Sequence, residues 1–129
     1  MRLLAFTVFL LMAQLSWAQQ QQALPEKAGY TFAAFALLVG NYYVAHDKWP
    51  SSAQQLREYT TRLARQFPPG ERDIIPTVWS HIKHAEFTPR GKDLLVSARF
   101  RSEGRDYRHA AVLHPGKSSE EIVDRMSPK

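Results

Sequence analysis

The sequence predicts an α+β fold, in which a long apolar helix and an amphipathic helix pack on a small antiparallel β-meander or hairpin, with a short helix near the C-terminus. Two stretches predict it. Residues 28–45 carry no charged side chain, are too many for an ordinary strand, and repeat their bulky side chains at helical spacing. Residues 93–101 and 107–114 are rich in apolar side chains and flank a short turn, as the strands of a hairpin do.

Residues 1–18 are predicted to form an N-terminal signal peptide. Arg2 provides a positive charge, an apolar segment follows, and Ser16-Trp17-Ala18 places small residues at the two positions that signal peptidase reads. We expect cleavage after Ala18 and export to the periplasm or the cell exterior. A polar leader over 19–27 then connects to a single domain over 28–129. The alternative is an uncleaved segment that anchors the protein to the membrane.

The composition of the chain restricts the classes of protein to which it can belong. It contains no cysteine, so thiolate zinc sites and cysteine nucleophiles are excluded, and packing alone must hold an exported domain together. This is more typical of a bacterial periplasm than of small disulfide-rich scaffolds. The formal net charge is +5, without the dense basic tracts of nucleic-acid-binding proteins. We therefore expect an acidic protein or an anionic envelope component as partner, and no nucleic acid.

The uncharged run 28–45 is interpreted as the central helix. Its bulky stripe consists of Phe32, Phe35, Val39 and Tyr43. A second stripe, on which a neighbouring backbone can approach closely, consists of Gly29, Ala33, Ala36 and Gly40. A helix that is apolar on most faces is either a core helix or a membrane span. Glycines, Asn41 and paired tyrosines favour the core helix, and the alternative is an inner-membrane protein that spans with both 3–17 and 28–45.

A second helix is predicted from Ala53 to Gln66. Pro50 ends the first helix, and Ser51 or Ser52 caps the second, with Gln54 or Gln55 closing a capping box. The apolar positions are Leu56, Tyr59, Leu63 and Phe67. The arginines point elsewhere, to the solvated side of an amphipathic helix: Arg57, Arg62 and Arg65.

The segment from Thr77 to Ala85 fits a helix or a strand equally well. Trp79 and Ile82 suit a helical turn, whereas β-branched residues suit an extended chain. Residues 88–91 predict a turn, with proline second and glycine fourth. A capping box over 118–121 predicts a short C-terminal helix that carries Ile122, Val123 and Met126.

The register of the hairpin follows from pairing Arg101 with Asp106. The apolar face then pairs Phe100 with Tyr107, Ala98 with His109, Val96 with Ala111 and Leu94 with Leu113. A slip by one residue would bury arginines, so this register is well specified. The opposite face pairs Arg99 with Arg108, Ser97 with Ala110 and Leu95 with Val112.

Arg99 and Arg108 are the starting point for the functional prediction. Like charges that face each other across two strands are destabilising unless an anion or a carboxylate lies nearby. The candidate anion-binding residues are Arg90, Lys92, Arg99, Arg101 and Arg108. Aromatic side chains that stack on nucleobases are lacking on this face, because Phe100 and Tyr107 point to the core. The alternative interpretation is the solvated outer face of a half-buried sheet.

No enzymatic activity is predicted. The sequence has no G-x-S-x-G, no H-E-x-x-H and no phosphate-binding glycine loop. His81 with His84, and His109 with His114, have spacings that metal ligands can show, but no recognised ligand motif surrounds them. We assign no catalytic residue, metal or cofactor, and keep a small hydrolase of unknown class as a further alternative, since paired carboxylates leave no spacing pattern.

Overall fold

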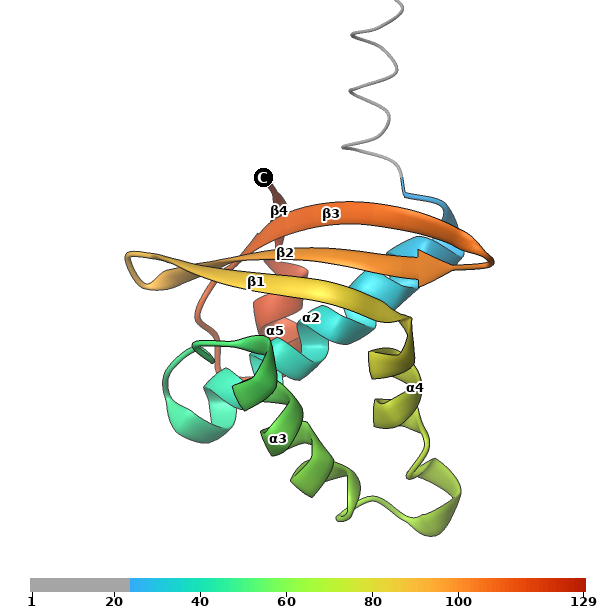
Figure 1. The fold of residues 1–129 in the computed structure, drawn as a ribbon. Coiled ribbons are helices and arrows are strands. Elements are labelled where there is room, and N and C mark those ends of the chain that lie inside the picture. The colour runs from blue at the N-terminus through green and yellow to red at the C-terminus, as the bar shows by residue number, and fades with distance from the viewer. Residues whose placement is uncertain (1–23) are drawn as a thin grey trace, which may run out of the picture.

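The structure is a computed structural model that describes residues 24–129. The predicted signal peptide and the segment 3–17 lie outside the described residues. The helices are α2 (Glu26–His46), α3 (Ala53–Ala64), the 3-10 turn η1 (Pro69–Glu71), α4 (Ile74–His81) and α5 (Ser119–Asp124) (Figure 1). The strands β1 (Ile82–Arg90), β2 (Asp93–Ser102), β3 (Arg105–Leu113) and β4 (Ser127–Pro128) form one antiparallel sheet in the order β1-β2-β3-β4. The predicted α+β class is confirmed.

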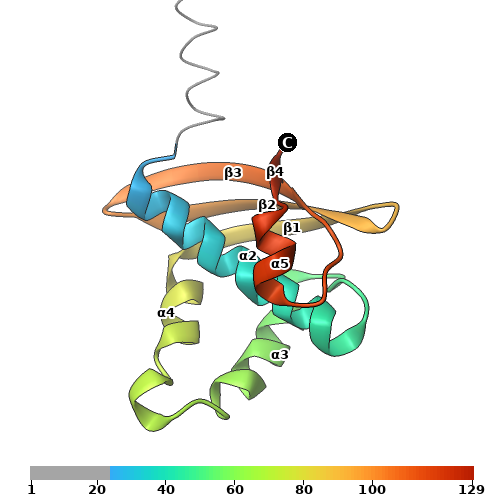
Figure 2. The same cartoon turned by 180° about the vertical axis from the view of Figure 1, so that it is seen from behind.

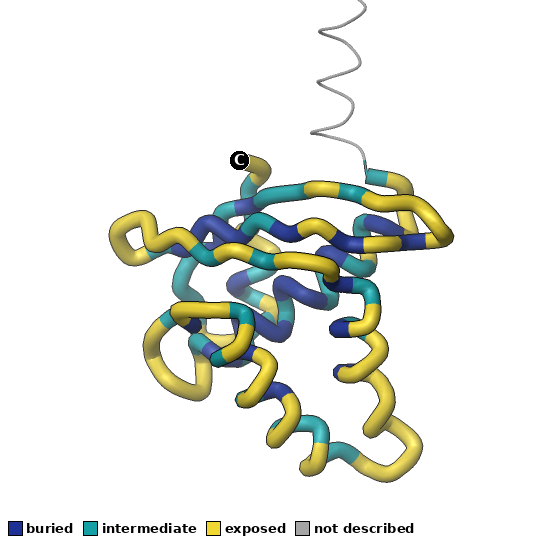
Figure 3. Tube along the Cα trace, viewed as in Figure 1, coloured by how far each residue is buried: buried dark blue, intermediate teal, exposed yellow. Residues whose placement is uncertain are grey.

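Helix α2 lies along one face of the sheet, and α5 packs against α2 on that same face (Figures 1 and 2). Phe35 and Val39 are fully buried, and the ring of Phe32 lies 6.1 Å from that of Phe100 on β2. Tyr42, at 4% exposure, continues this stripe, whereas the predicted Tyr43 is half-buried against Trp49. Figure 3 shows that burial is concentrated where α2 and β2 face each other.

Among the described residues, α2 is the one helix whose length and composition would allow it to cross a membrane. In this fold 44% of its most apolar window is buried in the protein. Its buried residues, Phe35 and Val39 among them, pack against the sheet and α5 in this fold, which is the arrangement that its glycine, asparagine and tyrosine content favours.

The register of β2 and β3 is the predicted one at every position. Arg101 pairs with Asp106, and Leu94 pairs with Leu113 at the far end. The inner face, which contacts α2, buries Leu94, Val96 and Phe100 completely. Alternation of apolar and charged residues favours this pairing, because a slip by one residue would place guanidinium groups in the core.

The predicted secondary structure and the structure differ in several places. The segment from Thr77 to Ala85 is divided, since α4 ends at His81 and β1 begins at Ile82. Strand β1 continues through Pro89, and the turn falls at Gly91, whose φ is +60°. Pro89 is tolerated because β1 is an edge strand. Helix α3 ends at Ala64 rather than Gln66, and strand β4 was not predicted.

The predicted helix caps are present. The side chain of Ser52 accepts a hydrogen bond from the Gln55 amide at 3.1 Å, and the Ser51 amide donates to the Gln55 side chain at 2.7 Å. The side chain of Ser118 accepts from the Glu121 amide at 3.1 Å. These bonds satisfy amides that have no partner inside the helix.

Candidate functional site

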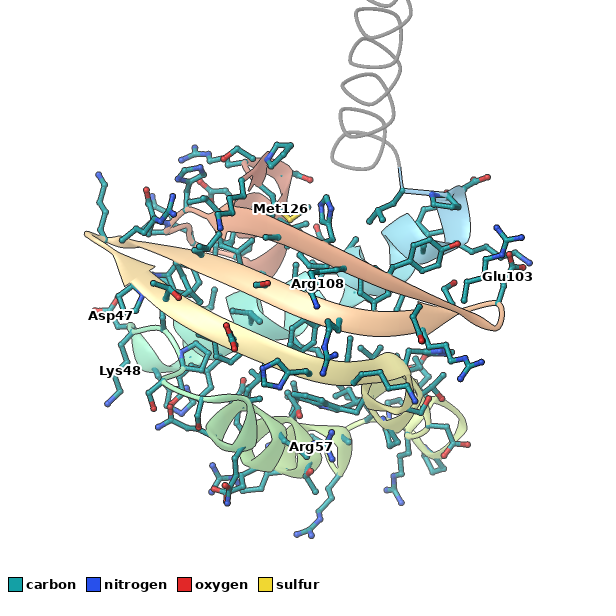
Figure 4. The ribbon with its side chains drawn as sticks, turned by 45° about the horizontal axis from the view of Figure 1, so that its top comes forward. Asp47, Lys48, Arg57, Glu103, Arg108 and Met126 are labelled. Atoms are coloured by element: carbon teal, nitrogen blue, oxygen red, sulfur yellow. The ribbon has the colours of Figure 1, made fainter. Side chains whose placement is uncertain are left out.

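The outer face of the sheet, opposite α2, carries the candidate site (Figure 4). Strand alternation places Arg99 of β2 and Arg108 of β3 on this face, where the two residues are direct cross-strand partners. Both are exposed. Within residues 24–129, no carboxylate lies within 4.0 Å of either guanidinium group.

Strand β1 brings a carboxylate close to these arginines. Glu86 pairs with Ser97, and the imidazole Nε2 of His84 lies 3.0 Å from Glu86 Oε1. The hydrogen bond from His84 is the main reason that the pKa of Glu86 is lowered, and the charges of Arg108 and Arg99 lower it further. Glu86 thus offsets part of the charge repulsion, while it stays bonded to His84 rather than to an arginine.

A β-bulge adds a third cation. Ile82 faces Phe100 and His84 faces Arg99, so Lys83 is an extra residue in β1 without a cross-strand partner of its own. A bulge redirects the side chain of its inserted residue. Lys83 accordingly lines a shallow recess of about 490 Å³ together with Arg99 and Arg108. The other lining residues are Phe100, Asp106 and Tyr107.

A second recess, of about 330 Å³, lies beside the first and shares both arginines with it. Its remaining lining residues are His84, Glu86 and Ser97. Arg99 and Arg108 therefore stand between a recess that contains Lys83 and Asp106 and a recess that contains His84 and Glu86. We call these two recesses together the outer-face site.

The structure divides the five candidate anion-binding residues into two groups. Arg99 and Arg108 lie together, and Arg101 is two positions along β2, where its guanidinium donates to the Gly104 carbonyl at 3.2 Å. Arg90 pairs with Asp93 at the opposite end of the sheet, about 20 Å from Arg99 at ~3.3 Å per residue. Lys92 belongs to the turn there, and its carbonyl accepts from Trp49.

Sequence reasoning missed Lys83, His84 and Glu86. The segment that contains them was open between helix and strand, so no face was assigned to these side chains. A period of two is nevertheless visible, since His84 and Glu86 alternate with Ala85 and Phe87. Continuing the sheet pattern one strand upstream would have placed both on the arginine face.

Comparison of the chain with protein-family models, with curated proteins and with solved structures finds no match. The function therefore has to be argued from the geometry of the site.

The geometry fits anion binding better than catalysis. Guanidinium groups bind phosphate and carboxylate through paired, charge-assisted hydrogen bonds. The His84 and Glu86 pair resembles the base and orienting group of a hydrolase, but their side chains are 53% and 70% exposed. A nucleophile also needs a hydrogen bond to its base, and the hydrogen bonds of the described residues include none between Ser97 and His84.

The histidines do not assemble into a metal site. Within residues 24–129 no group of three or more potential ligands lies close enough to hold a metal ion. His81 Nδ1 lies 3.0 Å from the Arg101 carbonyl, whereas His84 is on the outer face. His109 lies on the inner face, where its ring meets Phe32 edge-on at 4.7 Å.

Proposed function

We propose that this protein is an exported, non-enzymatic binding domain that holds an anionic group of an envelope component or an acidic protein at the outer-face site. Lys83, Arg99 and Arg108 are the contacting residues. The observation that carries this proposal is the direct cross-strand pairing of two exposed arginines. Such a pair is unfavourable in isolation and becomes favourable once an anion lies between the two charges.

The shape of the site favours a small anionic group over an extended polymer. Its recesses are shallow, and their volumes of about 330 and 490 Å³ fall at the lower end of the range for small-molecule sites. Glu86 closes one side with negative charge, so a long polyanion would meet repulsion there. A phosphate or carboxylate group that projects from a larger partner fits both features.

Export is proposed on the basis of the N-terminal sequence and the lack of cysteine. The N-terminal residue of the mature protein tests this proposal. A mature chain that begins at Gln19 is expected, and a chain that retains Met1 in the membrane fraction would favour the anchored form.

Vesicle binding tests the anion site. We expect the mature protein to bind phosphatidylglycerol vesicles in a salt-sensitive manner and to ignore phosphatidylcholine vesicles. Arg99→Ser with Arg108→Ser should weaken binding by about 2 kcal/mol, roughly thirtyfold, since each basic side chain near an anionic surface contributes about 1 kcal/mol. The matched control, Arg90→Ser with Lys92→Ser, removes the same charge from the far end of the sheet. Equal losses in both variants, or none in either, would contradict the proposal.

The alternative function is an inner-membrane protein in which 3–17 and 28–45 both span. The length and apolar composition of α2 favour it. Protease protection and fractionation separate the two proposals. A soluble periplasmic product is expected of the exported domain and is incompatible with two spans.

A further inference from the structure

A groove lies between side chains of α3 and side chains of α4. These two helices lie below the sheet in Figure 1, on the side away from its outer face. It has a volume of about 380 Å³. Its apolar lining consists of Ala64, Ile75, Pro76 and Trp79, and its polar lining consists of Arg57, Thr61 and Ser80.

Trp79 is fixed in the wall of this groove. Its indole N–H donates to the buried Thr60 hydroxyl at 2.8 Å, and its ring meets Phe35 edge-on at 5.4 Å. The ring therefore cannot rotate to fill the space between the helices without breaking a buried hydrogen bond. The groove is a stable feature of the packing of α3 and α4.

The border of the groove is basic. The Arg57 guanidinium lies 4.6 Å from the centre of the Trp79 ring, an arrangement typical of a cation–π contact. Arg62 and Arg65 continue along the exposed side of α3 and, with Arg57, line a second hollow, in which Glu58 is the single acidic side chain. No carboxylate within residues 24–129 lies within 4.0 Å of these three guanidinium groups.

We infer that this groove binds an acidic peptide segment of another protein. One apolar side chain of the segment enters between α3 and α4, against Trp79 and Ile75, and its carboxylates pair with Arg57, Arg62 and Arg65. Charge complementarity identifies the partner, because an apolar groove beside a row of unpaired arginines favours a segment that combines apolar and acidic residues. Arg57 is already positioned by Trp79, which reduces the entropy lost when it binds a carboxylate.

Fluorescence anisotropy of labelled synthetic peptides tests this inference on the full mature chain. The first probe is a short glutamate peptide with one central phenylalanine; the second replaces the phenylalanine with alanine; the third replaces every glutamate with lysine. We expect saturable binding of the first probe, about tenfold weaker binding of the second, as for the loss of an anchor residue, and no binding of the third.

Protein variants then locate the binding. Arg62→Gln with Arg65→Gln changes only exposed side chains and should weaken binding of the first probe about tenfold, because two ion pairs at the rim are lost. Ala64→Glu, which places a carboxylate in the groove, should abolish it, with thermal unfolding as the check that this variant folds. Arg99→Ser with Arg108→Ser removes the same charge at the outer-face site and should leave peptide binding unchanged.

The same experiment defines what would overturn the inference. The inference would be overturned if the acidic phenylalanine peptide failed to bind, if the lysine peptide bound equally well, or if the outer-face variant lost as much peptide binding as the Arg62 and Arg65 variant. Binding of single-stranded DNA in preference to the acidic peptide would also overturn it and would identify a stacking role for Trp79. The pair Arg62 and Arg65 is tested separately from the pair Arg99 and Arg108. A failure of peptide binding at the groove therefore leaves the outer-face proposal intact.

Discussion

Gly40 of α2 lies directly against the backbone of Ser119 in α5. A Cβ atom on Gly40 would be 3.2 Å from both the Cα and the carbonyl oxygen of Ser119. Such a distance is tighter than most real Cβ contacts, so α5 would have to shift by a few tenths of an ångström to accept a methyl group. The absence of a side chain at this position therefore sets how closely the C-terminal helix can pack on the central helix.

Gly40→Ala is expected to destabilise the protein despite the higher helix propensity of alanine. Overpacking should cost about 1–3 kcal/mol in the free energy of unfolding. The matched control is Gly29→Ala in the same helix, where an added Cβ has no neighbour within 4 Å, and which should stabilise by about 0.5–1 kcal/mol. Urea unfolding of both variants measures the difference, and equal effects would refute close packing of α5.

Asp47→Gly is expected to stabilise the end of α2. Asp47 adopts a left-handed conformation with a φ of 57°, and its amide donates to the Tyr43 carbonyl at 2.7 Å. Glycine adopts this conformation without the steric cost, so we expect a gain of about 0.5–1 kcal/mol in unfolding free energy. Lys48→Gly, at the neighbouring exposed position (Figure 4), is the control. A loss of stability in Asp47→Gly would contradict the cap geometry.

Thr60→Val is expected to destabilise through Trp79. Thr60 is fully buried and accepts the hydrogen bond of the indole N–H. Valine leaves that donor unsatisfied, which should cost about 1–3 kcal/mol in unfolding free energy. Thr61→Val is the control, since the exposed Thr61 hydroxyl donates its hydrogen bond to the Arg57 carbonyl and leaves no buried donor unsatisfied when it is removed. Thermal and urea unfolding should separate the two variants, and similar stabilities would exclude a structural role for the indole bond.

His109 predicts a loss of stability in mild acid. Burial lowers the pKa of His109 below its ordinary value of 6.5. Below that pH the unfolded chain binds a proton that the folded chain resists, so the unfolding free energy falls as the pH drops. Between pH 7 and pH 5, the unfolding free energy of His109→Leu should change less with pH than that of the unaltered protein. This range lies above 4.5, the ordinary pKa of Glu86. An unchanged slope in urea unfolding would show that His109 is not the cause.

The parts of the fold that the sequence predicted are those fixed by alternation or by local hydrogen bonds. Register across β2 and β3 follows from arginines that cannot enter the core, and the caps of α3 and α5 follow from serines before a helical pattern. The length of the uncharged run and the helical spacing of its bulky side chains identified α2. In each case the deciding interaction lies within a short stretch of sequence.

The parts that were missed depend on tertiary contacts. Whether residues 77–85 form helix or strand is decided by Trp79, which reaches Thr60 on α3, and by the pairing of Ile82 with Phe100. The bulge at Lys83 depends on that pairing as well. Strand β4 has two residues, too few for any periodic pattern. The position of Lys83 was therefore beyond local sequence analysis, whereas the alternation at His84 and Glu86 and the arginines on β2 and β3 were within its reach.

Anion binding by Arg99 and Arg108 is tested most directly by NMR of the arginine Nε–Hε groups during titration with inorganic phosphate and with phosphatidylglycerol nanodiscs. Saturable shifts of the Arg99 and Arg108 signals are expected, with smaller shifts at Arg90 on the far end of the sheet. Shifts of equal size at all arginines, or shifts that leave Arg99 and Arg108 unaffected, would contradict a binding site on the outer face.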